Sequence, residues 1–371
     1  MRIAYLITRG DAVGGASIHV RDLACAMSAR GHHVIVFVGG HGHVEDRLRT
    51  AGLTVQPLEW LQREINPLRD YRALQEITAA LRNWRPDLVS THTGKAGWLG
   101  RAACARLGVP VIYTPHGWTI GERISRLHGE LFTRAEKAAA RWSDAIVCVC
   151  EHERRLALRK GVAPADKLRV IYTGVADVPP DLRAHPAANP PRILSVARFE
   201  PPKDHHTLLQ ALERIREEDW ELELIGEGPL EGAIRNLAAE LGLSGRLQFR
   251  GYDPEPAAAF SSAQLFVLSS RSEGFPRSIL EAMRAGLPVV ASKVGGVGEA
   301  VTHGEVGLLV EAGEGEGLAA AIRRMIRDVS VRERFGRAAR LLYEERFRLE
   351  RTVDQTAQLY HAVLNRSLRE A

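Results

Sequence analysis

Long apolar runs are missing from this 371-residue chain. No segment approaches the roughly 20 consecutive apolar residues that a bilayer-spanning helix needs. The apolar run at residues 1–7 is too short for a signal peptide and is typical of a first strand. We therefore expect a protein that neither spans a membrane nor is exported.

Cysteine is scarce, with four residues in the whole chain. Cys25 and Cys104 lie far apart, while Cys148 and Cys150 fall on one face of a predicted strand. None has the spacing of a metal site or of a redox pair. We interpret all four as reduced core residues of a cytosolic protein.

Signals for nucleic-acid binding are also missing, because there is no Cys/His finger, aromatic RNA-binding motif or Lys/Arg block. Charge is nevertheless unevenly distributed. Residues 1–172 contain 25 Lys and Arg against 16 Asp and Glu (25 − 16 = +9), and the remaining residues contain 25 against 29 (25 − 29 = −4). A basic first half suits a protein that works on an anionic surface or acceptor, such as the inner face of the cell membrane.

The length favours two domains, because one hydrophobic core rarely serves 371 residues. Apolar runs of strand length alternate with helical segments in both halves, which predicts an α/β fold. Proline-rich sequence without periodicity places an interdomain linker at residues 173–190, between domains of residues 1–172 and 191–346. Residues 347–371 read as a long amphipathic helix.

A strand, a loop and a helix are predicted in succession over residues 263–286. The strand is an apolar run, Gly274 and Pro276 interrupt it, and good helix formers follow over residues 278–285. The first turn of such a helix carries unpaired N–H groups and the positive end of the peptide dipole. It therefore attracts an anion such as phosphate.

Two glutamates flank this predicted anion site. Glu273 lies in the loop, and Glu281, near the start of the helix, can accept two hydrogen bonds from a diol such as a ribose. The alternative is that Glu281 only stabilises an exposed helix and Glu273 occupies a solvated turn. This stretch alone does not decide between the two interpretations.

Other residues of interest follow predicted strands. Gly14 and Gly15 leave room for a bulky ligand near the backbone. His116 stands at the carboxyl end of a strand, where open α/β sheets bind ligands. Arg198 and Lys203, between a strand and a helix, suit a diphosphate. Each also has an ordinary alternative. The glycine pair can be a simple turn, His116 can be a buried or capping histidine, and Arg198 and Lys203 can be surface charges.

Two nucleotide-binding motifs are incomplete. The Gly-Lys pair at 94–95 has Val89 where a P-loop needs glycine and Ala96 where it needs Ser or Thr, so we reject a P-loop. Residues 226–229 give half of a dinucleotide fingerprint, but Glu231 replaces its third glycine, which argues against NAD and a dehydrogenase.

In their order along the chain, these signals resemble the retaining glycosyltransferases of family 4. The motifs that carry the resemblance are Gly14-Gly15, Pro115-His116-Gly117, Arg198…Lys203, Gly226-Glu-Gly-Pro229 and Glu273-Gly-Phe…Leu280-Glu281-Ala-Met. The resemblance implies the GT-B fold, in which two Rossmann-like domains with parallel sheets face each other across a cleft. It also implies that residues 347–371 pack back toward the first domain.

The implied reaction moves a hexose or N-acetylhexosamine-type sugar from a nucleotide diphosphate sugar, expected to be a UDP-sugar. The implied acceptor is a saccharide or a polyprenyl-diphosphate-linked saccharide. No metal or other cofactor is expected, because the cations are side chains and no carboxylate cluster suggests Mg²⁺ ligation. Two alternatives stay open: a nucleotide-sugar epimerase on the same fold, and a non-catalytic GT-B-like subunit that binds a partner transferase.

The resemblance assigns four residues to the reacting centre. Arg198 and Lys203 match the basic residues that neutralise the donor diphosphate. Glu273 matches the first acid of a paired-glutamate motif, which lies against the donor sugar. His116 matches a histidine near the primary alcohol of that sugar.

The resemblance also implies the nucleotide contacts. Glu281 matches a ribose-binding glutamate, and the turn at 250–251 resembles the one that holds the base. Pro276 departs from the family pattern and removes one N–H donor from the anion site. The residues expected to contact the nucleotide sugar, besides Arg198 and Lys203, are Gly14, Gly15, Arg250, Gly251, Gly274, Phe275, Ser278 and Glu281.

Two segments of the first half refine the expected acceptor. Residues 91–101 and 113–118 are similar to bacterial capsule and O-antigen transferases, which use UDP-sugars on polyprenyl-diphosphate acceptors. Residues 118–142, with Arg123 among their cations, read as a helix with basic and apolar faces. Such a helix suits an anionic membrane surface, or is an ordinary amphipathic helix with a solvated face.

Overall fold

The structure is a computed structural model that describes residues 1–118, 120 and 126–370. The chain divides into two compact units. Unit 1 comprises Met1–Thr173 and Glu350–Ala371, and unit 2 comprises Gly174–Leu349. No helix among the described residues combines the length and the apolarity needed to cross a bilayer.

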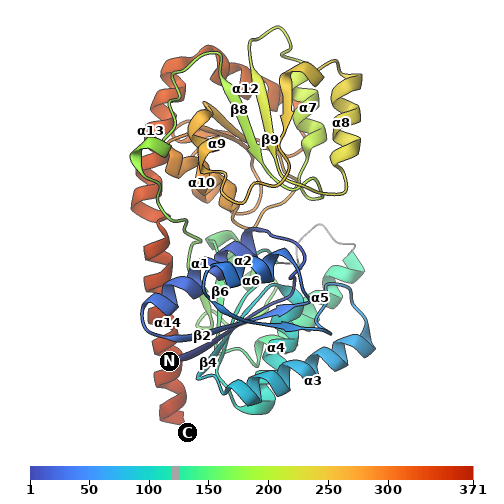
Figure 1. The fold of residues 1–371 in the computed structure, drawn as a ribbon, viewed down its shortest axis with the longest axis vertical. Helices are drawn as coiled ribbons and strands as arrows, with labels where there is room; N and C mark the ends of the chain where they lie inside the picture. The colour runs from blue at the N-terminus through green and yellow to red at the C-terminus, as the bar shows by residue number, and fades with distance from the viewer. Residues whose placement is uncertain (119, 121–125, 371) are drawn as a thin grey trace. The chain divides into compact units, whose positions relative to one another are not determined.

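Unit 1 is built on a seven-stranded sheet in the order β3-β2-β1-β4-β5-β6-β7, with every neighbouring pair parallel (Figure 1). The strands are β1 (Arg2–Ile7), β2 (His33–Gly39), β3 (Thr54–Leu58), β4 (Leu88–His92), β5 (Val111–Thr114), β6 (Ala145–Cys148) and β7 (Leu168–Val170). Strand β3 lies at the sheet edge and contains Pro57, which an edge strand tolerates but which weakens the strand signal in the sequence.

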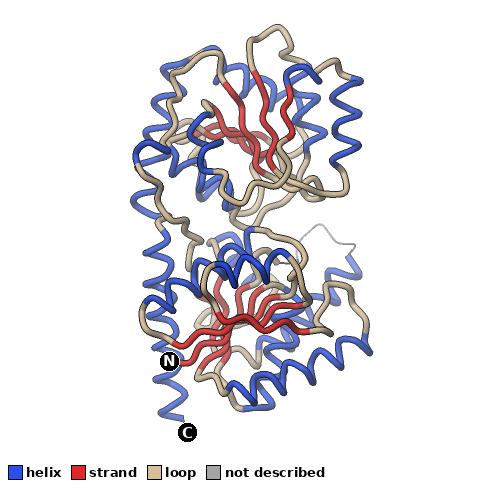
Figure 2. The backbone as a smooth tube through the Cα atoms, viewed as in Figure 1, coloured by secondary structure: helices blue, strands red, loops and turns tan. Residues whose placement is uncertain are grey.

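Helices cover both faces of this sheet (Figure 2). They are α1 (Gly15–Ala29), α2 (His43–Thr50), α3 (Pro67–Trp84), α4 (Gly94–Leu107), α5 (Arg126–Ala140), α6 (Glu151–Arg159) and α14 (Leu349–Glu370). Asn66 caps α3 by accepting hydrogen bonds from the backbone of Leu68 and Arg69, at 3.2 and 3.1 Å. The helix expected over 118–142 is α5, and Arg123 lies outside the described residues.

Unit 2 is built on a six-stranded parallel sheet in the order β10-β9-β8-β11-β12-β13. Its strands are β8 (Arg192–Val196), β9 (Glu221–Ile225), β10 (Leu247–Phe249), β11 (Leu265–Leu268), β12 (Val289–Ser292) and β13 (Gly307–Val310). Its helices are α7 (His205–Glu213), α8 (Glu231–Glu240), α9 (Ala257–Ser262), α10 (Arg277–Ala285), α11 (Val297–Ala300), α12 (Gly315–Arg327) and α13 (Val329–Arg346).

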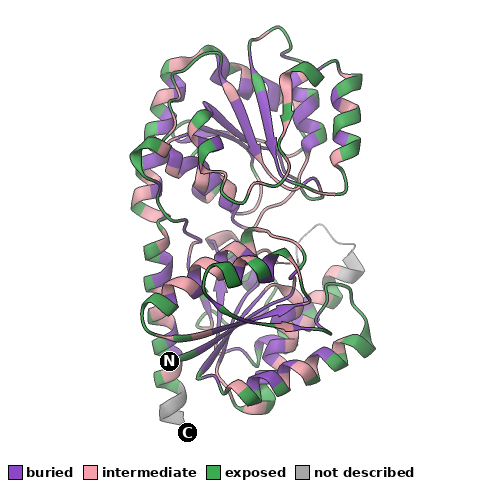
Figure 3. Ribbon diagram, viewed as in Figure 1, coloured by how far each residue is buried: buried purple, intermediate pink, exposed green. Residues whose placement is uncertain are grey.

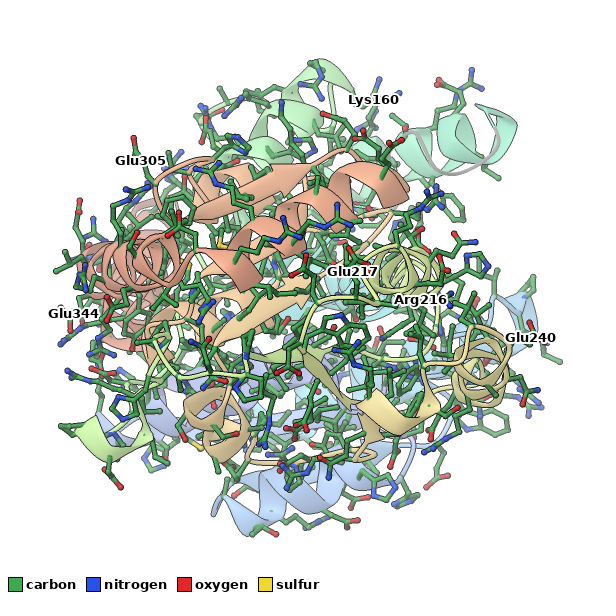
Figure 4. All side chains as sticks on the ribbon, turned by 90° about the horizontal axis from the view of Figure 1, so that it is seen from above. Lys160, Arg216, Glu217, Glu240, Glu305 and Glu344 are labelled. Carbon is green, nitrogen blue, oxygen red and sulfur yellow. The ribbon has the colours of Figure 1, made fainter. Side chains whose placement is uncertain are left out.

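Burial follows the layers of each unit: the strands are buried, and the helices expose their outer faces (Figure 3). Exposed charged residues occupy the ends of the unit 2 helices, with Arg216 and Glu217 just after α7 and Glu240 at the end of α8 (Figure 4). Cys25 is only partly buried, in contrast to its expected core position. The other three cysteines are buried, and all four are free thiols.

The predicted linker is part of unit 2 from Gly174 onward. The Arg332 guanidinium holds it by donating hydrogen bonds to the carbonyl oxygens of Pro186 and Ala188 and to the Asn189 side chain, at 2.7, 3.3 and 2.7 Å. Composition predicted an interdomain linker here, because proline-rich sequence lacks the periodicity of helices and strands. The hydrogen bonds of Arg332 anchor this segment to α13.

Candidate functional site

Each sheet has one place where the strand order reverses. In unit 1 the chain runs outward from β1 to β2 and β3, then returns to β4 on the other side of β1. In unit 2 the same reversal occurs between β8 and β11. The loops after such strands diverge and leave a crevice at the carboxyl ends, where open α/β sheets bind ligands. The candidate residues of each unit lie in these loops and those next to them.

In unit 2 this arrangement joins Lys203, after β8, to Glu273, after β11. The Lys203 ammonium donates a hydrogen bond to the Glu273 carboxylate at 2.5 Å, and their side chains are 19% and 10% exposed. The backbones are also tied, because the Arg271 N–H donates to the Pro202 carbonyl at 2.8 Å. The pair thus places one cation and one carboxylate at the reversal point.

Arg198 also lies in the loop after β8. Its guanidinium forms an ion pair with Glu200 at 3.1 Å, and about a third of its side chain is exposed. Sequence analysis did not single out Glu200. Arg198 and Lys203 therefore both have acidic neighbours in this structure, and an incoming diphosphate would have to share or replace those contacts.

The half fingerprint at 226–229 has a packing explanation. A Cβ on Gly226, where φ is +150°, would lie 2.1 Å from the Ala197 carbonyl oxygen, and one on Gly228 would lie 2.5 Å from that of Phe199. These glycines let the loop after β9 pack against the loop that carries Arg198. They do not require a dinucleotide.

The turn expected to hold the base follows β10. The Gly251 carbonyl accepts a hydrogen bond from the Gly226 N–H at 2.8 Å, which fixes the turn against the loop after β9. The Arg250 guanidinium donates to Glu223 of β9 at 2.7 Å. The Arg250 side chain therefore stabilises the sheet edge, and the backbone of the turn is what this arrangement positions.

The helix predicted at the anion site is α10, which begins directly after Pro276 and ends at Gly286, where φ is +81°. Arg277 donates a hydrogen bond from Nε to Glu281 Oε1 at 3.0 Å. Sequence analysis did not assign this role to Arg277, although the i,i+4 spacing is a recognisable signal. The salt bridge orients the carboxylate that we expected to bind a ribose.

The loop before α10 is held from two sides. Gly295 has φ +53°, and a Cβ there would lie 1.8 Å from the Glu273 carbonyl oxygen. The Gly274 carbonyl accepts a hydrogen bond from the Gly296 N–H at 2.9 Å. Phe275 is buried and packs on Phe347, with ring centroids 5.4 Å apart, so the structure gives it a packing role. Ser278 lies in the first turn of α10.

In unit 1, His116 follows β5 in a left-handed conformation with φ +55°. Its Nε2 lies 2.9 Å from Nδ1 of His92, at the end of β4, and its ring packs edge-on against His19 of α1, with centroids 4.9 Å apart. Burial, then electrostatic interactions with the neighbouring His19 and His92, lower the pKa of His116 well below its usual value. His116 is therefore neutral at pH 7.

Gly14 precedes α1 and lies about one helical turn from His19, which brings the first loop near His116. The Gly14 N–H donates a hydrogen bond to the Ser17 hydroxyl at 3.0 Å, and a Cβ added to Gly14 would meet nothing within 4 Å. Gly15 is the first residue of α1. Packing therefore does not require a glycine at position 14.

Two family models match the chain. The model described as "Glycosyltransferase Family 4" matches residues 13–177, and "Glycosyl transferases group 1" matches residues 180–342. The lipopolysaccharide core biosynthesis glycosyltransferase LpsE of Rhizobium meliloti is 32% identical over 245 residues, which are 64% of this chain and 69% of LpsE. Glycogen synthase of Mycobacterium tuberculosis is 29% identical over 380 residues, covering 94% and 91% of the two chains.

Solved structures agree on the fold. Anabaena Alr3699/HepE in complex with UDP and glucose superposes with a TM-score of 0.84 at 24% identity, covering 97% of this chain and 99% of the other. Sucrose-phosphate synthase from Thermosynechococcus elongatus gives 0.83 at 25% identity, covering 98% and 100%. Fold and relatives together define a glycosyltransferase with two Rossmann-like halves. The chain belongs to the family 4 glycosyltransferases, which have the GT-B fold.

Proposed function

We propose that this chain is a retaining transferase that moves a hexose or N-acetylhexosamine-type sugar from a UDP-sugar to a saccharide or polyprenyl-diphosphate-linked acceptor. The observation that carries the proposal is the meeting of Lys203 and Glu273 at the strand-order reversal of unit 2, with Arg198 in the same loop as Lys203. A relative in Escherichia coli named UDP-Gal:alpha-D-GlcNAc-diphosphoundecaprenol alpha-1,3-galactosyltransferase, 26% identical over 321 residues, supports the choice of donor and acceptor.

In the proposed reaction the bond from the sugar C1 to the diphosphate oxygen breaks, and a bond from C1 to the acceptor oxygen forms on the same face. The acceptor proton passes to the departing phosphate oxygen, so no separate base is needed. Arg198, Lys203 and the first turn of α10 stabilise the charge that grows on the diphosphate. The Lys203 ammonium has three N–H donors, so it can contact Glu273 and a phosphate together.

A panel of UDP-, GDP- and ADP-sugars, each incubated with the protein and followed by nucleotide release, tests this function. We expect cleavage of a UDP-sugar at a rate that EDTA does not change, because side chains supply the positive charge. Preference for a GDP- or ADP-sugar would refute the proposed donor, and loss with EDTA that Mg²⁺ restores would refute metal independence. A freely isomerised sugar nucleotide without acceptor would indicate an epimerase, and no turnover of any donor would favour a non-catalytic subunit.

We also propose that unit 1 rests on the anionic inner face of the cell membrane. An exposed apolar patch lies in the loop before α3 and in its first turns: Trp60, Ile65, Leu68 and Tyr71 are 37%, 71%, 65% and 57% exposed. The same segment carries exposed arginines at positions 63, 69 and 72, together with exposed Glu59 and Glu64. Apolar side chains flanked by cations suit insertion at the boundary between headgroups and acyl chains.

Leu68→Glu should lower the fraction of protein that floats with anionic liposomes about tenfold or more, because burying a leucine in the lipid contributes about 2 kcal/mol and the new charge repels the surface. Leu341→Glu in α13 is the matched control, because Leu341 is also 65% exposed. We expect that variant to float like the wild type. A wild-type protein that does not float on anionic vesicles would instead leave a soluble acceptor.

A further inference from the structure

A chain of buried polar groups runs from His116 across the unit 1 sheet. His116 Nε2 lies 2.9 Å from His92 Nδ1, and His92 Nε2 lies 3.0 Å from the Ser90 hydroxyl. Ser90 and His92 are both 1% exposed and point to the same face of β4. The contacts of His92 therefore connect the histidine of the candidate site to the interior of the sheet.

The series of hydrogen-bonded groups continues into α14, whose buried face packs on unit 1. The Ser90 hydroxyl hydrogen-bonds to the Tyr360 hydroxyl, which donates to Tyr5 at 3.4 Å. Tyr5 and Ser90 are register partners on the neighbouring strands β1 and β4. Burial raises the pKa of Tyr360 to about 12, so its hydroxyl keeps its proton at any physiological pH.

The number of protons on each group decides which group donates in each of these hydrogen bonds. Tyr360 has one hydroxyl proton, which it donates to Tyr5, so Ser90 is the donor in the bond to Tyr360. The Ser90 proton is then used, and its oxygen must accept from His92 Nε2–H. Burial, with the His19 charge, lowers the pKa of His92 well below its usual value, so His92 is neutral and carries a single ring proton. Its Nδ1 is consequently an acceptor, and the donor to it is His116 Nε2–H.

We propose that Tyr360, Ser90 and His92 are positioning residues that hold His116 as the Nε2–H tautomer, with its Nδ1 lone pair as the hydrogen-bond acceptor offered to a substrate hydroxyl. The catalytic part of this inference rests on the proposed function, whereas the tautomer does not. His116 itself lies outside any helix or strand, in a left-handed turn after β5. The long C-terminal helix thus takes part in the site through Tyr360.

The same histidines form the one described group whose nitrogens lie close enough together for a metal, within 4.8 Å of one another for His19, His92 and His116. A metal bound by His92 Nδ1 and His116 Nε2 would replace the hydrogen bond between them. The two arrangements are therefore mutually exclusive, and one zinc per chain in the purified protein, lost in His92→Asn, would overturn the proposal.

NMR of protein labelled with ¹⁵N-histidine reads the arrangement directly, without any activity. The His116 signals are assigned by their loss in His116→Gln. We expect a proton on His116 Nε2 and a scalar coupling from that nitrogen to an unprotonated His92 Nδ1. A proton on His92 Nδ1, or no coupling across the pair, would overturn the proposal. If the coupling is present but no UDP-sugar is cleaved, the proposed function fails and the tautomer stands.

Kinetics then test whether the hydrogen bond matters for turnover. His92→Leu removes the acceptor, and we expect kcat to fall about 10- to 100-fold, the size of loss that follows when the partner orienting a metal-bound histidine is removed, with the donor KM unchanged. His92→Asn puts an oxygen close to the position of Nδ1 and should recover most of this loss. Equal losses in both variants, or a loss confined to KM, would contradict positioning through this atom.

The role of Tyr360, at the end of this series of hydrogen bonds, can be tested separately. Tyr360→Phe removes the hydroxyl that orients Ser90, and we expect the coupling between the two histidines to weaken and kcat to fall a few-fold. Tyr343→Phe removes another buried hydroxyl, which donates to the Val175 carbonyl at 3.0 Å in unit 2. Both variants remove one buried tyrosine hydroxyl, but only Tyr360 contacts Ser90, so only the first should affect kcat. An equal effect of both would reduce Tyr360 to a stability role.

Discussion

Lys203→Ala and Arg198→Ala should each lower the turnover of the UDP-sugar about a hundredfold or more, while the donor KM changes much less. A preorganised cation that meets the growing charge of a leaving diphosphate acts mainly in the transition state, and removing such a group costs about 2.7–4 kcal/mol of activation free energy. Initial-rate kinetics with the best donor of the nucleotide-sugar panel measure the effect. Rates like those of the wild type would refute the role of these cations.

Lys203→Ala also leaves the Glu273 carboxylate, which is 10% exposed, without its partner. The double change Lys203→Met with Glu273→Gln separates this structural cost from the chemical one, since it removes both charges and keeps similar volumes. We expect the double variant to recover thermal stability but not turnover. Recovery of turnover would mean that the pair only maintains the loop structure.

Arg246→Ala is the matched control for Arg198→Ala in the same unit. The Arg246 guanidinium donates to the Trp220 and Arg216 carbonyl oxygens, at 2.9 and 2.8 Å, and lies over the Trp220 ring. Because Trp220 precedes β9 and Arg246 precedes β10, this arginine sits at the amino-terminal edge of the sheet, opposite the candidate site. Its loss should lower stability and leave the turnover of the folded protein unchanged.

Arg101→Ala should destabilise unit 1 by about 3–5 kcal/mol, because it leaves a buried carboxylate without its partner. The Arg101 guanidinium is fully buried, lies 2.8 Å from Glu136, donates to the Gly97 carbonyl at 2.8 Å and covers the Tyr113 ring at 4.0 Å. Denaturant unfolding followed by tryptophan fluorescence measures the effect in unit 1, since five of the six tryptophans belong to it. A cost below about 1 kcal/mol, as for an exposed ion pair, would contradict this account.

An exposed ion pair on α5, the helix that carries Glu136, provides the comparison. Arg134 and Glu130 of α5 form an ion pair at 3.5 Å with side chains 76% and 57% exposed, so Arg134→Ala should change stability by no more than about 0.5 kcal/mol. The double change Arg101→Met with Glu136→Leu should recover much of the loss, because it leaves no buried charge.

Arg101 also changes the interpretation of residues 91–101, whose similarity to capsule and O-antigen transferases suggested a polyprenyl-linked acceptor. A Cβ on Gly97 would lie 2.1 Å from the Tyr113 ring, and one on Gly100 would lie 2.5 Å from Thr91. Close packing of α4 on the sheet therefore accounts for these two glycines and for Arg101. Since packing explains these residues in this chain, the acceptor has to be argued from other residues.

Much of the fold could be read from the sequence, because strands buried on both faces are continuous apolar runs. The strand and the helix predicted in succession over residues 263–286 are β11 and α10. Edge strand β3 carries polar residues and a proline, so its signal was too weak. Composition likewise could not show that Arg332 ties the proline-rich segment to unit 2.

By itself the sequence determined the alternation of strands and helices, the loops that carry the candidate residues and the family to which the chain belongs. Only the tertiary structure decided the partner of each charged or titratable group: Glu273 for Lys203, Glu223 for Arg250 and His92 for His116. The physical reason is that these partners lie 24 to 70 residues apart in the chain. Their meeting depends on strand order and register, which local patterns of hydrophobicity do not encode.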